Sequence, residues 1–144
     1  MNKEFRQCLE SKKIVSFARG KKLVKKELSV AKSDLTDAKA GYGSERYKWS
    51  TIQGYYAMFH AARALLYSRG YREKSHYCLV VALKALLVDE GKMDAQLVRD
   101  FLNAMNLRQA ADYEAEFSQS GAKAVIASAE KFIQKAATIL DIGE

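Results

Sequence analysis

The chain of 144 residues contains no proline, and it has only two cysteines and two histidines. Without proline, no residue interrupts a helix by removing a backbone donor. The cysteines, Cys8 and Cys78, form no CxxC pair, so their spacing supports neither a disulfide framework nor a zinc site. Cys78 belongs to the apolar run YCLVVAL and is expected to be a small core residue.

Long apolar runs are also missing. No stretch approaches the length needed to cross a membrane, and the first residues show no signal-peptide pattern. A phosphate-cradling GxxxxGK loop is absent as well, which argues against an ATPase. We therefore expect a cytoplasmic protein with no membrane partner, no metal and no other cofactor.

The residues that are present favour helices. Apolar residues make up 49% of the chain, and its alanine, leucine, lysine and glutamate are good helix formers. The length suits one domain with a buried core, here residues 1–144. Because glycines separate helix-patterned segments by short loops, we predict an all-α protein, an up-and-down bundle of five to six helices.

The glycines and the capping residues suggest where these helices begin and end. We expect helices over about residues 3–18, 21–40 and 44–69, a fourth capped by Ser75 and ending before Gly91, a fifth capped by Asp94, and a sixth or a continuation after Gly121. The third helix should begin at Ser44, and Gly70 should end it in the left-handed conformation.

The net charge of +7 lies in the first part of the chain. Residues 1–50 hold 13 Lys or Arg against 6 Asp or Glu, whereas the remainder is balanced. Between Lys12 and Lys26 there are seven cations and no acid. Such a block would attract a polyanion such as RNA, although it is equally typical of a solvated helix face.

The third predicted helix carries two stripes at three- and four-residue steps. The apolar stripe, expected to face the core, comprises Ile52, Tyr55, Phe59, Ala62 and Leu66. The polar stripe comprises Gln53, Tyr56, His60, Arg63 and Tyr67. In the structural interpretation, His60 and Tyr56 bond each other or backbone groups at a helix–helix seam. In the functional interpretation of this stripe, His60 and Arg63 line a polar groove or a dimer contact. With no acid or second histidine in the stripe, a metal site is not predicted.

The junction around Gly70 is the stronger candidate for chemistry. Metal-free RNA cleavage needs a base, an acid and cations on the developing phosphorane. Histidine can be acid or base near neutral pH, and arginine binds phosphate oxygens in a bidentate manner. Six residues separate Arg69 from His76, with Arg72 and Lys74 among them, and His76 would occupy the first turn of a helix. Alternatively, these residues only solvate an exposed turn.

Two motifs in this region resemble a known family. YYAMFHAARALL followed by RGYREKSH, and LRQAADYE at residues 107–114, are similar to motifs of the HEPN family of small helical domains. The resemblance implies a helical bundle that forms a two-fold dimer. Active members are metal-independent endoribonucleases, and many are toxins paired with a nucleotidyltransferase antitoxin. Others bind nucleotides or have lost catalysis.

Residue by residue, the resemblance makes Arg69 the motif arginine and His76 the motif histidine. The candidate RNA- or nucleotide-binding residues around them are Arg72, Lys74, Tyr77, Arg63, His60 and Arg108. Arg108 is also expected to pair with Asp112 one turn later. The position after the motif arginine, usually polar, is Gly70. This departure leaves a second hypothesis open, a non-catalytic nucleotide-binding or partner-docking module.

Overall fold

The computed structural model describes residues 2–142 and confirms an all-α protein with six α-helices in that range. The helices are α1 (Lys3–Glu10), α2 (Gly20–Gly43), α3 (Tyr47–Ser68), α4 (His76–Leu83), α5 (Ala95–Tyr113) and α6 (Gln119–Leu140). A π-helical turn, η1 (Lys84–Val88), continues α4. Two short strands, β1 (Ile14–Ser16) and β2 (Tyr71–Glu73), pair antiparallel.

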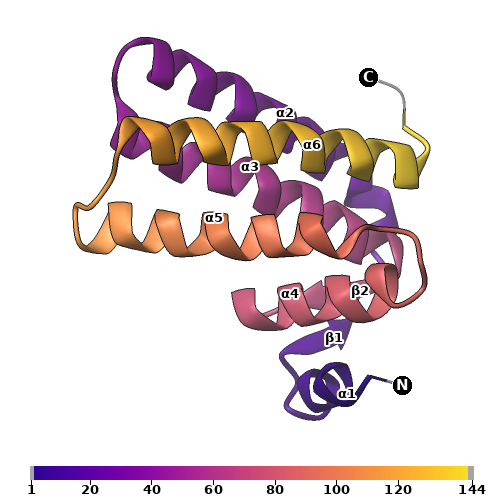
Figure 1. Cartoon of the computed structure of the whole chain (residues 1–144). Coiled ribbons are helices and arrows are strands. Elements are labelled where there is room, and N and C mark those ends of the chain that lie inside the picture. The colour runs from indigo at the N-terminus through magenta and orange to yellow at the C-terminus, as the bar shows by residue number, and fades with distance from the viewer. Residues whose placement is uncertain (1, 143–144) are drawn as a thin grey trace.

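The four long helices form the body of the molecule, as Figure 1 shows. α2, α3, α5 and α6 run side by side, while α4, the two strands and α1 extend from one side of this body. α3 is central and packs against α2, α5 and α6. At its crossing with α6, a Cβ on Gly54 would lie 2.8 Å from Val125 Cγ1, so only glycine permits this close approach.

The apolar stripe of α3 faces the core, as predicted. Its five members, from Ile52 to Leu66, are all buried, and Tyr55 is fully so. The polar stripe is half-buried except for Tyr67, which packs against Phe17 and joins a small second cluster with Val24. α3 is thus buried around most of its circumference, as a central helix must be.

The first predicted helix was wrong beyond Glu10. Lys12 adopts a left-handed φ of 60° after α1, and Ile14–Ser16 then pairs with Tyr71–Glu73, with Ile14 opposite Glu73. Ile14 is buried by this pairing. Strand pairing with a distant segment therefore overrides the local helical pattern.

The capping predictions were mostly correct. Gly70 has a φ of 80°, the Ser75 side chain accepts a bond from the Cys78 amide, and Asp94 caps α5. The prediction for Ser44 was wrong, because it ends α2 and α3 begins only after Arg46. The last helix is capped by Ser118 and begins ahead of Gly121.

The two cysteines form a disulfide, contrary to the interpretation from their spacing. Cys8 and Cys78 are 70 positions apart, yet their Cα atoms lie within 5.9 Å. The strand pairing brings α1 against α4, and this tertiary contact is invisible in the spacing. Cys78 is buried, as expected.

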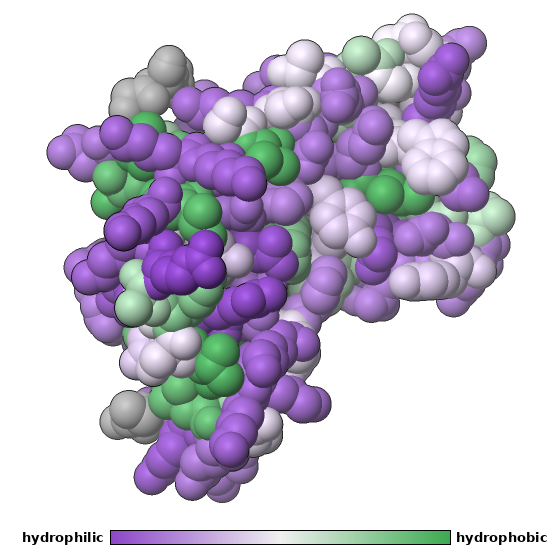
Figure 2. Space-filling model, turned by 180° about the vertical axis from the view of Figure 1, so that it is seen from behind, coloured by the Kyte–Doolittle hydropathy of each residue, from purple (hydrophilic) through white to green (hydrophobic). Residues whose placement is uncertain are grey.

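The surface seen from behind is largely hydrophilic, with only small and separate hydrophobic patches (Figure 2). No helix within residues 2–142 has the length and apolar character required to span a bilayer.

Candidate functional site

His76 is the first residue of α4, directly after the capping Ser75. Its ring stacks on Phe59, with centroids 4.7 Å apart, and lies nearly parallel to Tyr55. Its Nδ1 is 2.6 Å from the hydroxyl oxygen of Tyr55. Nε2 has no hydrogen-bond partner in the described part of the chain. The imidazole is therefore fixed by one nitrogen and available through the other.

Tyr55 provides a rigid support for this imidazole. Its ring is fully buried and stacks on Phe101 at 5.6 Å with an interplanar angle of 7°. Burial raises the pKa of Tyr55 well above its usual value, so the phenol stays protonated at neutral pH. The sequence had placed Tyr55 only in the core. The available signal was that a buried tyrosine hydroxyl usually finds a polar partner.

The surroundings of His76 favour its neutral form. Burial is the largest cause that lowers the pKa of His76, and the charges of Arg108 and Arg63 lower it further. Glu73 opposes them without reversing the shift. A neutral imidazole at pH 7 can accept a proton, which a general base must do.

Arg108 reaches this site from α5. It donates to the Tyr56 hydroxyl at 2.7 Å and forms the predicted ion pair with Asp112 at 3.4 Å. Its guanidinium lies over the rings of Tyr55 and Tyr113. Among residues 2–142, Arg108 Nε is the one buried side-chain nitrogen or oxygen without a hydrogen-bond partner. A buried donor of this kind is costly, and an anionic oxygen would satisfy it.

Arg63 is held within the protein. Its Nη2 lies 2.7 Å from Glu73 Oε2, its Nη1 lies 3.6 Å from Glu27, and its guanidinium packs over Phe59 at 4.5 Å. Its geometry is that of a residue that positions β2 and the aromatic support beneath His76. Spacing could not reveal Glu73 or Glu27 as partners, because both come from other elements.

His60 pairs with two acids of α2, which the residues of the polar stripe alone could not show. Its Nδ1 is 2.9 Å from Glu27, and its Nε2 is 3.8 Å from Asp34. Of the partners that the structural interpretation offered, Tyr56 is not bonded to His60, because its hydroxyl accepts a hydrogen bond from Arg108. In residues 2–142, no three His, Cys, Asp or Glu side chains are arranged to hold a metal ion.

Arg69 lies away from His76 within one chain. Its Nη2 is 3.4 Å from Glu90, beyond the end of η1. Arg69 follows Phe59, on which His76 stacks, by ten residues, which corresponds to about 15 Å along a helix. The structure therefore places the predicted catalytic pair at opposite ends of α4.

Three further candidates surround the strand pair. Arg72 is exposed and stacks over Phe17 at 5.4 Å, and the exposed Lys74 is bonded through its amide to Lys13. Tyr77 is 61% exposed and donates to Glu4 of α1. The cations of Arg72 and Lys74 remain open to an external ligand.

Fold and site together define a class: small helical bundles in which a histidine at a helix junction packs on a central helix beside arginines. The HEPN domain profile matches residues 24–140. The chain belongs to the HEPN domain family.

Its relatives come from several prokaryotes. Two from Methanocaldococcus jannaschii bear the name "Putative toxin": one is 28% identical over 75% of this chain and 81% of its own length, the other 27% identical over 81% of each. A protein from Archaeoglobus fulgidus named "UPF0332 protein" is 32% identical over 76% of this chain and 90% of its own.

Proposed function

We propose that this protein is a toxin-like HEPN protein that cleaves RNA without a metal, with His76 as acid–base catalyst. The observation that carries the proposal is geometric: Nδ1 of His76 is bonded to Tyr55 while Nε2 has no partner, and Arg108, whose buried Nε also lacks a partner, lies over the same Tyr55 ring. The names of the two relatives in Methanocaldococcus jannaschii support a toxin-like role.

The chemistry begins at the 2′-hydroxyl of RNA. When the Tyr55 hydroxyl accepts a bond from Nδ1–H, Nε2 of His76 carries the lone pair that accepts the 2′-hydroxyl proton. The 2′-oxygen bonds to phosphorus as the bond to the 5′-oxygen breaks, and that oxygen leaves with a proton from a second acid. Arg108 donates to a phosphate oxygen as charge develops on it.

A homodimer would supply what one chain lacks. Arg69 and His76 are separated within a chain, so Arg69 and the second acid would come from the other copy. Arg72, Lys74 and Tyr77 would contact the RNA backbone around the strand pair, with His60 and Arg63 beneath it. In a toxin–antitoxin pair, the proposed partner is a nucleotidyltransferase.

Replacing His76 with alanine tests the catalytic role. We expect RNA cleavage to fall by about 10²- to 10⁴-fold, the usual range for a general acid or base. Arg108→Met should also reduce cleavage, whereas Arg99→Met, which removes an exposed arginine of the same helix, should not. Thermal unfolding checks that each variant is folded. Cleavage at the wild-type rate by folded His76→Ala protein contradicts the proposal.

A second candidate is a non-catalytic RNA- or nucleotide-binding module, which could also dock a partner protein. The pairing of Arg69 with Glu90, away from His76, favours it. Such a protein would bind RNA with an affinity that falls steeply with salt, and it would cut nothing in either oligomeric state.

A further inference from the structure

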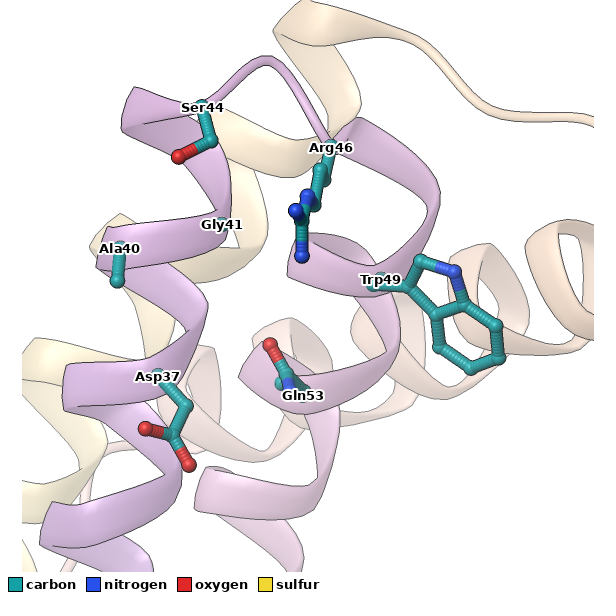
Figure 3. A pocket seen from close by; sticks show the side chains of 7 residues that line it. All are labelled: Asp37, Ala40, Gly41, Ser44, Arg46, Trp49 and Gln53. Carbon is teal, nitrogen blue, oxygen red and sulfur yellow. The ribbon is translucent and has the colours of Figure 1, made fainter.

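A cavity of about 500 Å³ lies where α2 ends and α3 begins. Its volume falls within the usual range for sites that take a small organic ligand. The polar residues that line it are Asp37, Ser44, Arg46 and Gln53, and Trp49 stands at its rim (Figure 3). This cavity plays no part in the function proposed above.

The polar side chains of the cavity have no partners. Within residues 2–142, no hydrogen bond or ion pair is formed by the side chains of Asp37, Ser44, Arg46 or Gln53. In Figure 3, Arg46 and Gln53 point into the space between the two helices, and Asp37 faces Gln53 across it. A cation, an amide and a carboxylate are therefore available together to an external ligand.

Trp49 adds an aromatic surface to this site. It is the only tryptophan of the chain, and 53% of it is exposed. Figure 3 shows its indole turned outward from α3. Lys48 Nζ lies over the ring, 5.0 Å from its centroid, which leaves the opposite face for a second planar group.

This surface leads toward His76. Trp49, Gln53 and Tyr56 follow one another on the same side of α3, and Tyr56 bonds to Arg108. Tyr113, 73% exposed, packs against the guanidinium of that arginine. Trp49 precedes Phe59, the residue beneath His76, by ten positions, or about 15 Å along the helix.

We infer that the cavity binds an unpaired nucleotide of the RNA whose phosphate lies at His76 and Arg108. Gln53 and Asp37 bond polar groups of this nucleotide and Arg46 binds its phosphate, while Trp49, whose indole is turned outward at the rim, stacks on the base of the adjoining unpaired nucleotide. Asp37 and Ser44 belong to residue types that are depleted in protein–protein interfaces, which favours a nucleotide over a protein partner. The inference rests on the proposed action on RNA and specifies single strands, because paired bases expose no face for stacking.

The fluorescence of Trp49 tests the inference directly. The probe is a single-stranded 2′-O-methyl oligoadenylate, which lacks the 2′-hydroxyl nucleophile and is not cleaved. We expect it to quench the fluorescence, and the same strand annealed to its complement to leave it nearly unchanged.

Binding of the labelled probe to variants adds a second measurement. Trp49→Ala should weaken binding by about 5- to 100-fold, the range for loss of one stacked base, while Trp49→Phe retains most of the affinity. Arg46→Ala should weaken binding and make it less sensitive to salt. Arg99→Ala, an exposed arginine on α5, is the matched control and should bind as the wild type does.

The outcomes separate this site from the proposed function. Quenching of Trp49 in the wild type, together with weaker binding of the labelled probe by Trp49→Ala, supports the site even if His76→Ala leaves RNA cleavage unaltered. Binding that depends on Arg108 but neither quenches Trp49 nor responds to its replacement overturns the site and leaves the function standing. A change in Trp49 fluorescence that follows protein concentration but not the addition of probe would identify a contact between copies of the chain at Trp49. This outcome also overturns the proposed nucleotide site.

Discussion

Replacing Arg63 with methionine should strongly destabilise the protein, because the carboxylate of Glu73 would remain buried without its main partner. Two nitrogens of Arg63 bond that carboxylate, with the shortest distance 2.7 Å. The Glu73 side chain is 5% exposed and that of Arg63 is 26% exposed. The carboxylate therefore has little access to water that could replace the guanidinium.

The expected cost follows from this burial. Breaking a buried ion pair by removing one partner costs about 3–5 kcal/mol, since the remaining charge is uncompensated. For a domain of this size, that corresponds to a fall in melting temperature of roughly 6–20 °C. Burial alone acts to lower the pKa of Arg63, but its bond to Glu73 outweighs this and raises the pKa, which shows how strongly the pair favours its charged form.

Urea unfolding followed by circular dichroism measures the cost. Arg99→Met, at an exposed arginine that bonds only Gln96, should change stability by less than about 0.5 kcal/mol. The double variant Arg63→Met with Glu73→Leu removes both charges and should recover most of the loss. A loss below about 1 kcal/mol for Arg63→Met, or a double variant as unstable as the single one, would refute the reasoning.

Three further predictions concern packing, the disulfide and pH. Gly54→Ala should cost about 1–3 kcal/mol in urea unfolding, because its Cβ would overlap α6, while Gly43→Ala, with open space around it, should not destabilise. Reducing the bond between Cys8 and Cys78 should cost roughly 4 kcal/mol through the long loop that it closes, and equal stability with and without reductant would contradict this. The pKa of His76 is lowered in the fold from 6.5, so the unfolded chain binds this proton more readily than the folded protein does. The contribution of His76 to the free energy of unfolding is therefore complete above pH 6.5 and is lost on acidification through the folded pKa. The variant His76→Phe should flatten the dependence of stability on pH below 6.5.

Local signals predicted those parts of the fold that local chemistry controls. The apolar stripe of α3 was recognised from its spacing, and Gly70, Ser75 and Asp94 were recognised because left-handed turns and helix caps depend on a single residue type. The end of α1 at Glu10 was not predicted, because the strand that follows it, β1, has only three residues and is too short to show the two-residue alternation of a strand.

The partners of the site residues depend on tertiary packing and could not be predicted in the same way. Glu27 precedes His60 by 33 positions and meets it only because α2 lies against α3. Glu73 approaches Arg63 only because the chain turns back after Gly70. The polar stripe was recognised from its spacing, but the partners of His60, Arg63 and Tyr56 come from other elements.

The strand β2 explains why the spacing of Arg69 and His76 does not bring them together. β2 runs back along α3, so that Glu73 meets Arg63 and His76 stacks on Phe59, and its three extended residues Tyr71–Glu73 advance about 10 Å. Pairing with β1 and the Glu73–Arg63 bond hold this segment in its extended form. The residues between the motif arginine and histidine thus act as a spacer that holds the two side chains apart within one chain.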